Sequence, residues 1–241
     1  AEGVVVQEGE AVLAVDARPD RDPVLLLRAA AAAAQAGLRL SPYAVARLAS
    51  ESAPLPEPWP VAARDSLISL LGAGRAAIPV WEALDQADLI SRLIPEWKVV
   101  RSAPQRNPVH RFTVDRHLVE TAVNASGLTR EVSRPDLLLV GALLHDIGKG
   151  QAGDHTEVGV RIVAELAPRL GFDASDSAVL VDMVRYHLLL PDTATRRDLA
   201  DPATAAAVAA AVKTQPAPAV VAGGPRAAAA PTGRAAGRPG E

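Results

Sequence analysis

Four of the five histidines lie between residues 117 and 187, and one of them, His145, directly precedes Asp146. Neutral imidazole nitrogens and carboxylate oxygens are good ligands for divalent ions such as Mg²⁺, Mn²⁺, Fe²⁺ and Zn²⁺. The chain contains no cysteine, which excludes a thiolate nucleophile, a sulfur-ligated metal and a disulfide framework. The chemistry open to these residues is therefore metal binding through nitrogen and oxygen.

The His145–Asp146 pair has two readings, a surface or capping pair and a binding site. The residues before it, 137–144, are all aliphatic except Gly141, which indicates a buried helix. A charged pair at the end of such a helix costs several kcal/mol unless it is ligated or hydrogen-bonded. Adjacent helical residues point about 100° apart, so both side chains can reach one ion only where the helix end is loosened, here by Gly148. This context favours the binding site.

The segment LLLVGALLHDIGKG, preceded by FTVDRHLVE, resembles the HD phosphohydrolase superfamily. HDIGKG alone is common to many HD proteins, but further segments narrow the resemblance. The chain is similar to the HD domain of the bifunctional PII uridylyltransferase/uridylyl-removing enzymes over roughly residues 1–212. The segments that carry this similarity are PQRNPVHRFTVDRHLVE, ALLHDIGKGQAGDHTEVG, VRYHLLLPDTATRRDLADP and LIPEWKVVRS.

The resemblance implies that His117, His145 and Asp146 are metal ligands, with Mg²⁺ or Mn²⁺ as the favoured ion. It also implies that His155 and His187 contact a phosphate group or a second metal ion. For these two the alternatives are a helix-capping histidine and a core histidine with a satisfied nitrogen.

Lys149 follows the metal pair and could neutralise a phosphate oxygen in the transition state, or be a solvated lysine at a helix end. Asp154 is better explained as a helix cap than as a ligand. Arg196 and Arg197 could bind a phosphate or pair with nearby aspartates. His110 lies outside the expected helix and is given at most an indirect role.

The activity implied by the resemblance is metal-dependent phosphodiester hydrolysis that removes UMP from uridylylated PII, a signalling protein that is then the expected partner. In that family glutamine regulates the balance of the two activities. Two alternatives stay open: an HD phosphohydrolase acting on a nucleotide or cyclic dinucleotide, and a catalytically inactive helical fragment.

Several parts of the resembled enzymes are not found in the sequence. No Gly-Ser turn with paired aspartates is present, so UMP transfer is not expected, and the glutamine-sensing ACT-type domains are expected beyond the chain. The aspartate that closes an HD metal site should follow a Leu-rich helix after DLADP, where this chain enters a Pro/Ala/Gly/Arg tail. The chain begins at Ala1 and its single methionine is Met183. We expect a fragment or processed piece, truncated or read out of frame after about residue 212, with a weakened metal site.

The elements that must position the site are mostly α-helical. Residues 4–15 predict a β-hairpin around Glu8-Gly9-Glu10. Helices are expected from Pro23 to Gly37 with Asp22 as cap, and over 42–51, 61–71, 75–93 and 175–189. Further helices should begin after Thr113, at Pro135 and after Asp154, and the four prolines of 53–60 should form a loop.

These elements predict a helical HD-superfamily fold with a small β-hairpin and a helical linker region at its start. We expect the hairpin and linker region over residues 1–96, a C-terminally incomplete HD domain over 97–212 and a disordered tail over 213–241.

Composition sets further bounds on the function. The chain has 241 residues, 49% of them hydrophobic, which is enough for a substantial core. A net charge of -3 gives no electrostatic basis for nucleic-acid binding, which requires a basic excess. The longest apolar stretches are interrupted or shorter than the ~20 residues that span a bilayer. We therefore expect a soluble, cytoplasmic protein that binds neither nucleic acid nor membrane.

Overall fold

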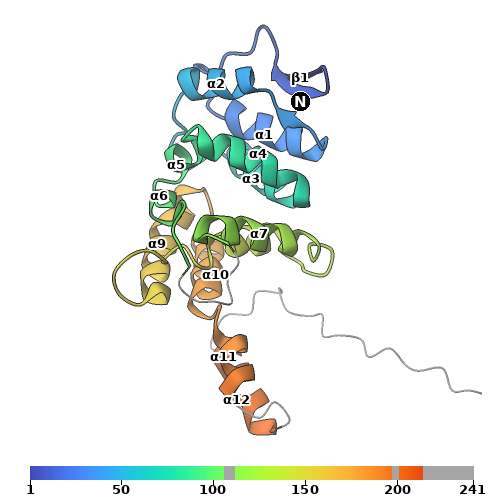
Figure 1. Ribbon diagram of the computed structural model, residues 1–241. Coiled ribbons are helices and arrows are strands. Elements are labelled where there is room, and N and C mark those ends of the chain that lie inside the picture. The colour runs from blue at the N-terminus through green and yellow to red at the C-terminus, as the bar shows by residue number, and fades with distance from the viewer. Residues whose placement is uncertain (106–111, 197–200, 214–241) are drawn as a thin grey trace, which may run out of the picture.

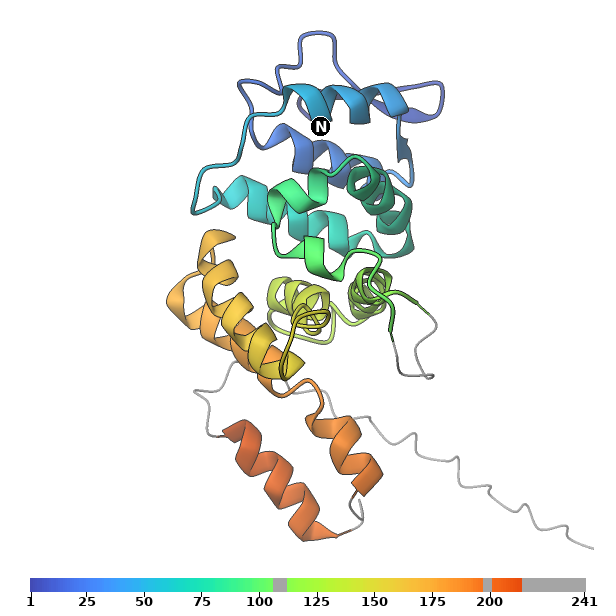
Figure 2. The same ribbon diagram turned by 60° about the vertical axis from the view of Figure 1, so that its left-hand side comes forward.

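The computed structural model describes residues 1–105, 112–196 and 201–213, and the arrangement of their elements is seen in Figures 1 and 2. A small sheet and the helices α1–α6 form one end of the molecule. Helices α7–α10 form the middle, and the pair α11–α12 extends from the opposite end. The predicted disordered tail, 213–241, lies outside the described residues except for Lys213, which is the last residue of α12.

The N-terminal sheet contains the predicted hairpin and one strand that was not predicted. Strands β1 (Val4–Gln7) and β2 (Glu10–Leu13) pair antiparallel, with Gln7 opposite Glu10. Glu8 and Gly9 between them both have positive φ, as a tight two-residue hairpin turn requires. Strand β3 (Arg39–Leu40) adds to β2 in parallel. Two residues are too few to show an alternating pattern, so the sequence carried no signal for β3.

The helices of the N-terminal part follow the prediction with two corrections. Helix α1 begins at Leu25 and not at Pro23, because the Asp22 carboxylate accepts from the Val24 N–H and Val24 is the N-cap. The single helix expected over 75–93 is broken at Asp88, whose φ is +58°. The elements are α1 (Leu25–Gln35), α2 (Pro42–Glu51), α3 (Val61–Gly72), η1 (Gly74–Ala76), α4 (Ala77–Gln86), α5 (Leu89–Leu93) and α6 (Trp97–Val100).

The helices after α6 carry the site residues, and two of their ends differ from the prediction. Helix α8 ends at Leu144, before Gly148, and α10 ends at Arg185. The helix predicted over 175–189 was expected to stop at Pro191, but Pro191 lies in the first turn of the next helix, α11, where a missing N–H is tolerated. These elements are α7 (Val114–Ser126), α8 (Pro135–Leu144), α9 (His155–Arg169), α10 (Ala174–Arg185), α11 (Leu189–Arg196) and α12 (Pro202–Lys213).

One apolar core runs from Val4 in the sheet to Val184 in α10, so it links the two halves of the molecule. The boundary expected near residue 97 stays a prediction. In the described part of the chain, no single helix is long and apolar enough to cross a membrane. The pair Val61–Gly72 and Gly74–Gln86 meets that test only when both are counted together, and it is bent by 110°.

The predicted proline-rich loop, 53–60, braces the C-terminal end of α9. The Trp59 N–H donates to the Arg169 carbonyl oxygen at 2.8 Å. The Arg169 guanidinium forms ion pairs with Glu57 at 3.3 Å and with Glu96 at 2.5 Å. Gly171, just after α9, has φ +84°, and a Cβ there would lie 2.6 Å from the Trp59 carbonyl oxygen. The loop therefore fixes one end of the helix whose other end begins at His155.

Candidate metal centre

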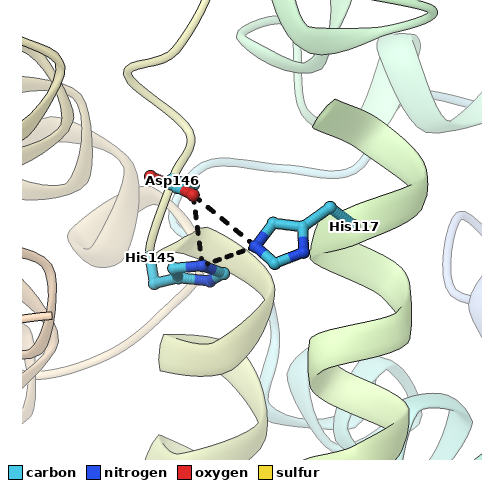
Figure 3. A group of neighbouring side chains, drawn as sticks. All are labelled: His117, His145 and Asp146. Atoms are coloured by element: carbon cyan, nitrogen blue, oxygen red, sulfur yellow. Dashed lines mark hydrogen bonds and ion pairs between the residues drawn. The ribbon is translucent and has the colours of Figure 1, made fainter. Parts of the chain in front are cut away.

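Helices α7 and α8 bring the three predicted metal ligands together. His117 is in the first part of α7 and points toward the C-terminal end of α8, where His145 and Asp146 lie in the turn that follows the helix (Figure 3). The Nε2 atoms of His117 and His145 are 3.2 Å apart. The Asp146 Oδ2 atom lies 3.6 Å from the first and 3.3 Å from the second. Three ligand atoms therefore face one point.

The end of α8 also orients the His145 ring. Its Nδ1 lies 2.8 Å from the Ala142 carbonyl oxygen, which can only accept a hydrogen bond. The proton is therefore on Nδ1, and the Nε2 lone pair is directed to the cluster. The last carbonyl groups of a helix have no partner within it. Here one of them acts as the second-shell group that fixes a ligand ring.

A second cluster shares the same carboxylate and contains the other two predicted histidines. The Asp146 Oδ1 atom lies 3.3 Å from His187 Nε2 and 3.8 Å from His155 Nε2. His187 follows α10, and its Nδ1 lies 2.6 Å from the Val184 carbonyl oxygen, so its tautomer is set in the same way as that of His145. Asp146 is thus common to two groups that could each hold a metal ion.

Two buried atoms of the second cluster have no hydrogen-bond partner among the described residues. They are Asp146 Oδ1 and His187 Nε2, on side chains that are 4% and 8% exposed. With the His187 proton on Nδ1, both atoms are acceptors that face each other. Leaving buried acceptors unsatisfied costs about 1–3 kcal/mol each. Either a second proton on His187 or a cation between the two atoms would satisfy them, so these residues fit a divalent ion.

The electrostatics of the cluster agree with this geometry. Burial alone would raise the pKa of Asp146, but His145, His187 and Lys149 outweigh it and hold that pKa well below its usual range. Burial alone would lower the pKa of His187, but the Asp146 carboxylate outweighs it, and the net shift is upward. Asp146 is therefore ionised at neutral pH, with Lys149 and the histidines around it.

Lys149 is the cation closest to that carboxylate. Its Nζ lies 2.6 Å from Asp146 Oδ2 and donates to Gln105 Oε1 at 3.3 Å. Lys149 is thus paired with Asp146 while its side chain is 24% exposed, and its role toward a phosphate stays a prediction. Gln105 was not singled out from the sequence, because a lone glutamine before α7 carries no pattern. Only the fold brings it to Lys149.

A close backbone approach at Gly148 allows the second cluster to form. A Cβ on Gly148 would collide with the backbone of His155 and Gly159, so the turn after Asp146 lies directly against α9. Asp154 is the N-cap of α9, as predicted, and its side chain accepts from the N–H groups of residues 156 and 157. His155 is therefore the first helical residue and not a capping group. The close approach at Gly148 brings it within reach of Asp146.

Some predicted residues fall outside this description. His110, Arg197 and the side chain of Arg196 are not among the described residues. Within the described residues, Asp146 is the carboxylate of both candidate clusters, and neither contains a further aspartate. The missing closing aspartate stays a prediction.

A cavity of about 620 Å³ opens beside the centre. Lys149 and His155 form its wall on the metal side. The other lining residues are Val99, Ala103, Pro104, Gln105, Val114, Gly150, Gln151 and Leu188.

Comparison with known proteins finds relatives that share the segment carrying this geometry. Residues 114–219 match the HD domain. The chain is 64% identical over 215 residues to the bifunctional uridylyltransferase/uridylyl-removing enzyme of Streptomyces coelicolor, and this match covers 89% of the chain and 26% of the relative. The enzymes of the same name from Mycobacterium tuberculosis and Corynebacterium glutamicum are 51% and 38% identical over 89% and 80% of the chain.

The match covers 27% of the Mycobacterium tuberculosis enzyme and 28% of the Corynebacterium glutamicum enzyme. The chain thus spans about a quarter of the length of the curated relatives it matches. The chain carries an HD domain, and over most of its length it matches a segment of the bifunctional uridylyltransferase/uridylyl-removing enzymes.

Proposed function

We propose that this chain hydrolyses a phosphodiester bond with the help of a divalent metal ion, and that its substrate is uridylylated PII, from which it removes UMP. The observation that carries the proposal is the shared Asp146 carboxylate, which faces histidine Nε2 atoms with both of its oxygens. The choice of a uridylyl group as the part removed is supported by the relatives, which are named uridylyltransferase/uridylyl-removing enzymes.

In this proposal His117, His145 and Asp146 hold the ion. Imidazole and carboxylate ligands suit several divalent ions, and the resemblance favours Mg²⁺ or Mn²⁺ among them. When bound, such an ion lowers the pKa of water and polarises phosphoryl oxygens. The protein contributes fixed ring orientations and a carboxylate that stays charged.

Lys149, His155 and His187 orient the phosphate. His155 is the most exposed of the four described histidines, at 32%, and it lines the cavity. Its imidazole can therefore contact a phosphate oxygen. Lys149 adds a positive charge beside Asp146, where negative charge builds on the phosphate during reaction. Water adds its oxygen to phosphorus, the bond from phosphorus to the PII oxygen breaks, that oxygen takes a proton, and UMP leaves.

The test uses the purified chain, first treated with a chelator and then loaded with Mn²⁺. Mass spectrometry of uridylylated PII should show loss of the uridylyl group, and the solution should contain UMP. Free nucleotides and cyclic dinucleotides serve as competing substrates. The proposal fails if the chain binds Mn²⁺ but leaves uridylylated PII intact, or if it prefers one of the competing substrates.

A further inference from the structure

One wall of the cavity beside the metal centre lies outside the segment that matches the HD domain. The match begins at residue 114, and the lining residues that precede it belong to a segment here called the 99–105 wall: Val99, Ala103, Pro104 and Gln105. The wall touches the turn that carries Lys149 at two points. A Cβ on Gly150, which has φ +87°, would lie 2.9 Å from the Val99 carbonyl oxygen, and Gln105 Oε1 accepts from Lys149 Nζ at 3.3 Å. The wall therefore helps to fix where the lysine lies.

The wall turns at Ser102, whose backbone is in a conformation that serine rarely adopts. Its φ is +54°, in the left-handed region that is unfavourable for any residue with a Cβ. Such a conformation persists only where neighbouring groups hold it. On one side of the turn, the Arg101 guanidinium donates to the Asp85 carboxylate at 3.1 Å and to the Asp85 carbonyl oxygen at 2.7 Å. The direction in which the wall continues after Ser102 thus depends on contacts made far from the metal centre.

Asp115, the second residue of α7, contacts the strained residue itself. Its Oδ2 atom accepts from the Ser102 N–H at 2.8 Å, and its Oδ1 atom accepts from the Arg116 N–H at 2.8 Å. Hydrogen bonds to an ionised carboxylate are stronger than those between neutral groups. Asp115 belongs to neither metal cluster, although it is on the same helix as His117. Its side chain therefore ties the turn of the wall to a ligand helix without touching the ion.

We propose that Asp115 is a positioning residue for Lys149: by holding Ser102 in the left-handed conformation, it places Gln105 where its Oε1 receives the lysine ammonium. The inference rests on the proposed function, in which Lys149 orients the phosphate. Gln105 lines the cavity and contacts the ammonium from that side, whereas Asp146 contacts it from the metal side. Without the Asp115 acceptor, Ser102 returns to a negative φ and the three residues after it are redirected. Lys149 then keeps only Asp146 and turns away from the cavity.

Calorimetric titration of the Mn²⁺-loaded chain with 5′-UMP tests this inference. We expect Asp115→Ala to weaken UMP binding about fivefold, a typical size for a residue that acts through another. Asp115→Asn keeps a side-chain oxygen that accepts from the Ser102 N–H and should bind UMP like the unchanged chain. Adding Ser102→Gly to Asp115→Ala should restore most of the affinity, because glycine adopts a positive φ without support. Asp173→Ala is the matched control, since it removes another carboxylate that accepts from a backbone N–H at the start of a helix.

Two further measurements separate positioning from a general loss of structure. In a chain that carries Lys149→Ala, Asp115→Ala should cause no additional loss of UMP binding, because the lysine that it positions is gone. Mn²⁺ affinity, measured by equilibrium dialysis, should be the same in every Asp115 variant. Thermal unfolding verifies that each variant is folded.

The inference is overturned if Asp115→Ala binds UMP as tightly as Asp173→Ala, or if Ser102→Gly restores nothing. It is also overturned if Asp115→Ala weakens UMP binding equally with and without Lys149, or if UMP binding is absent or independent of Lys149. Since UMP binding is measured without hydrolysis, it separates the two proposals. A chain whose UMP binding depends on Asp115 and Lys149 but that leaves uridylylated PII intact contradicts the proposed function alone.

Discussion

Helices α1 and α8 are both short, apolar and buried, but their C-terminal ends differ. After α1, backbone groups satisfy the last carbonyls: the N–H of Gly37 donates to Ala34, and that of Leu38 donates to Ala33. After α8, the carbonyl of Ala142 accepts from the ring of His145. The end of α1 therefore only turns the chain, whereas the end of α8 also orients a metal ligand.

The end of α10 repeats the arrangement of α8, with the Val184 carbonyl oxygen facing His187 Nδ1. Carbonyl oxygens in the last turns of α8 and α10 thus orient two of the four histidines. In both places the helix supplies a fixed carbonyl group, and a histidine just beyond the helix supplies the chemistry. Five substitutions test this difference between a helix end that turns the chain and one that builds a site.

The largest effect is expected from Asp146→Asn, which removes the charge shared by both clusters. Affinity for Mn²⁺ should fall by more than about 100-fold, because loss of a group that only supports a ligand already costs up to that factor. His117→Ala should weaken only the first cluster. Equilibrium dialysis with metal analysis measures both, and equal loss in the two variants would mean that the clusters are not bridged by Asp146.

Gly148→Ala should be the next in size. Its Cβ would meet backbone atoms of His155 and Gly159, which cannot rotate away. We expect about 3 kcal/mol of destabilisation, at the upper end of overpacking costs, together with weaker Mn²⁺ binding. Urea unfolding and dialysis measure the two quantities. Unchanged metal binding would show that the turn can move from α9 without disturbing the site.

Arg134→Met tests the opposite ends of α8 and α10. Arg134 pairs with Asp136 of α8 at 2.7 Å and with Asp176 of α10 at 2.6 Å. Its loss leaves two partly buried carboxylates unpaired, which should cost about 2 kcal/mol at pH 7. Thermal unfolding measures the difference in stability between the variant and the unchanged chain.

The same pair predicts a pH dependence. Burial alone would raise the pKa of Asp136, but Arg134 outweighs it and lowers that pKa. Because the pKa of Asp136 is lower in the folded chain than in the unfolded chain, where it is ~3.9, the ionised carboxylate stabilises the fold at a pH above that unfolded pKa. This stabilisation disappears as the pH falls through the folded-state pKa. The difference in free energy of unfolding between Arg134→Met and the unchanged chain should therefore be largest at pH 7 and shrink below about pH 4. A difference that is independent of pH would exclude the ion pair as its cause.

Gly37→Ala should have the smallest effect and is the counterpart of Gly148→Ala. Gly37 has φ +67°, and nothing lies within 4 Å of a Cβ built there. The cost is then that of the left-handed backbone alone, about 1 kcal/mol. Metal affinity should not change. A loss of metal binding would mean that the end of α1 is coupled to the site.

The sequence predicted the residues of the site better than their arrangement. His145 and Asp146 could be found because a charged pair at the end of an apolar helix needs an explanation. The resemblance implies that Asp146 can bridge toward a water or a second ion, but no local pattern shows how its other oxygen meets His155 and His187, because this depends on how α9 and α10 pack against the turn. Gln105 and the parallel strand β3 were missed for the same reason: their partners are distant in sequence, and neither makes a local pattern.

The contact between the proline-rich loop and α9 has a further consequence. Arg169 and Gly171 hold the far end of α9 to Trp59 and Glu57, while His155 stands at its near end. A proteolytic cut in the loop would therefore loosen a histidine of the second cluster from a distance. Residues 53–60 contribute no ligand to either cluster, yet an HD domain excised without them would lose the anchor of one of its ligand helices.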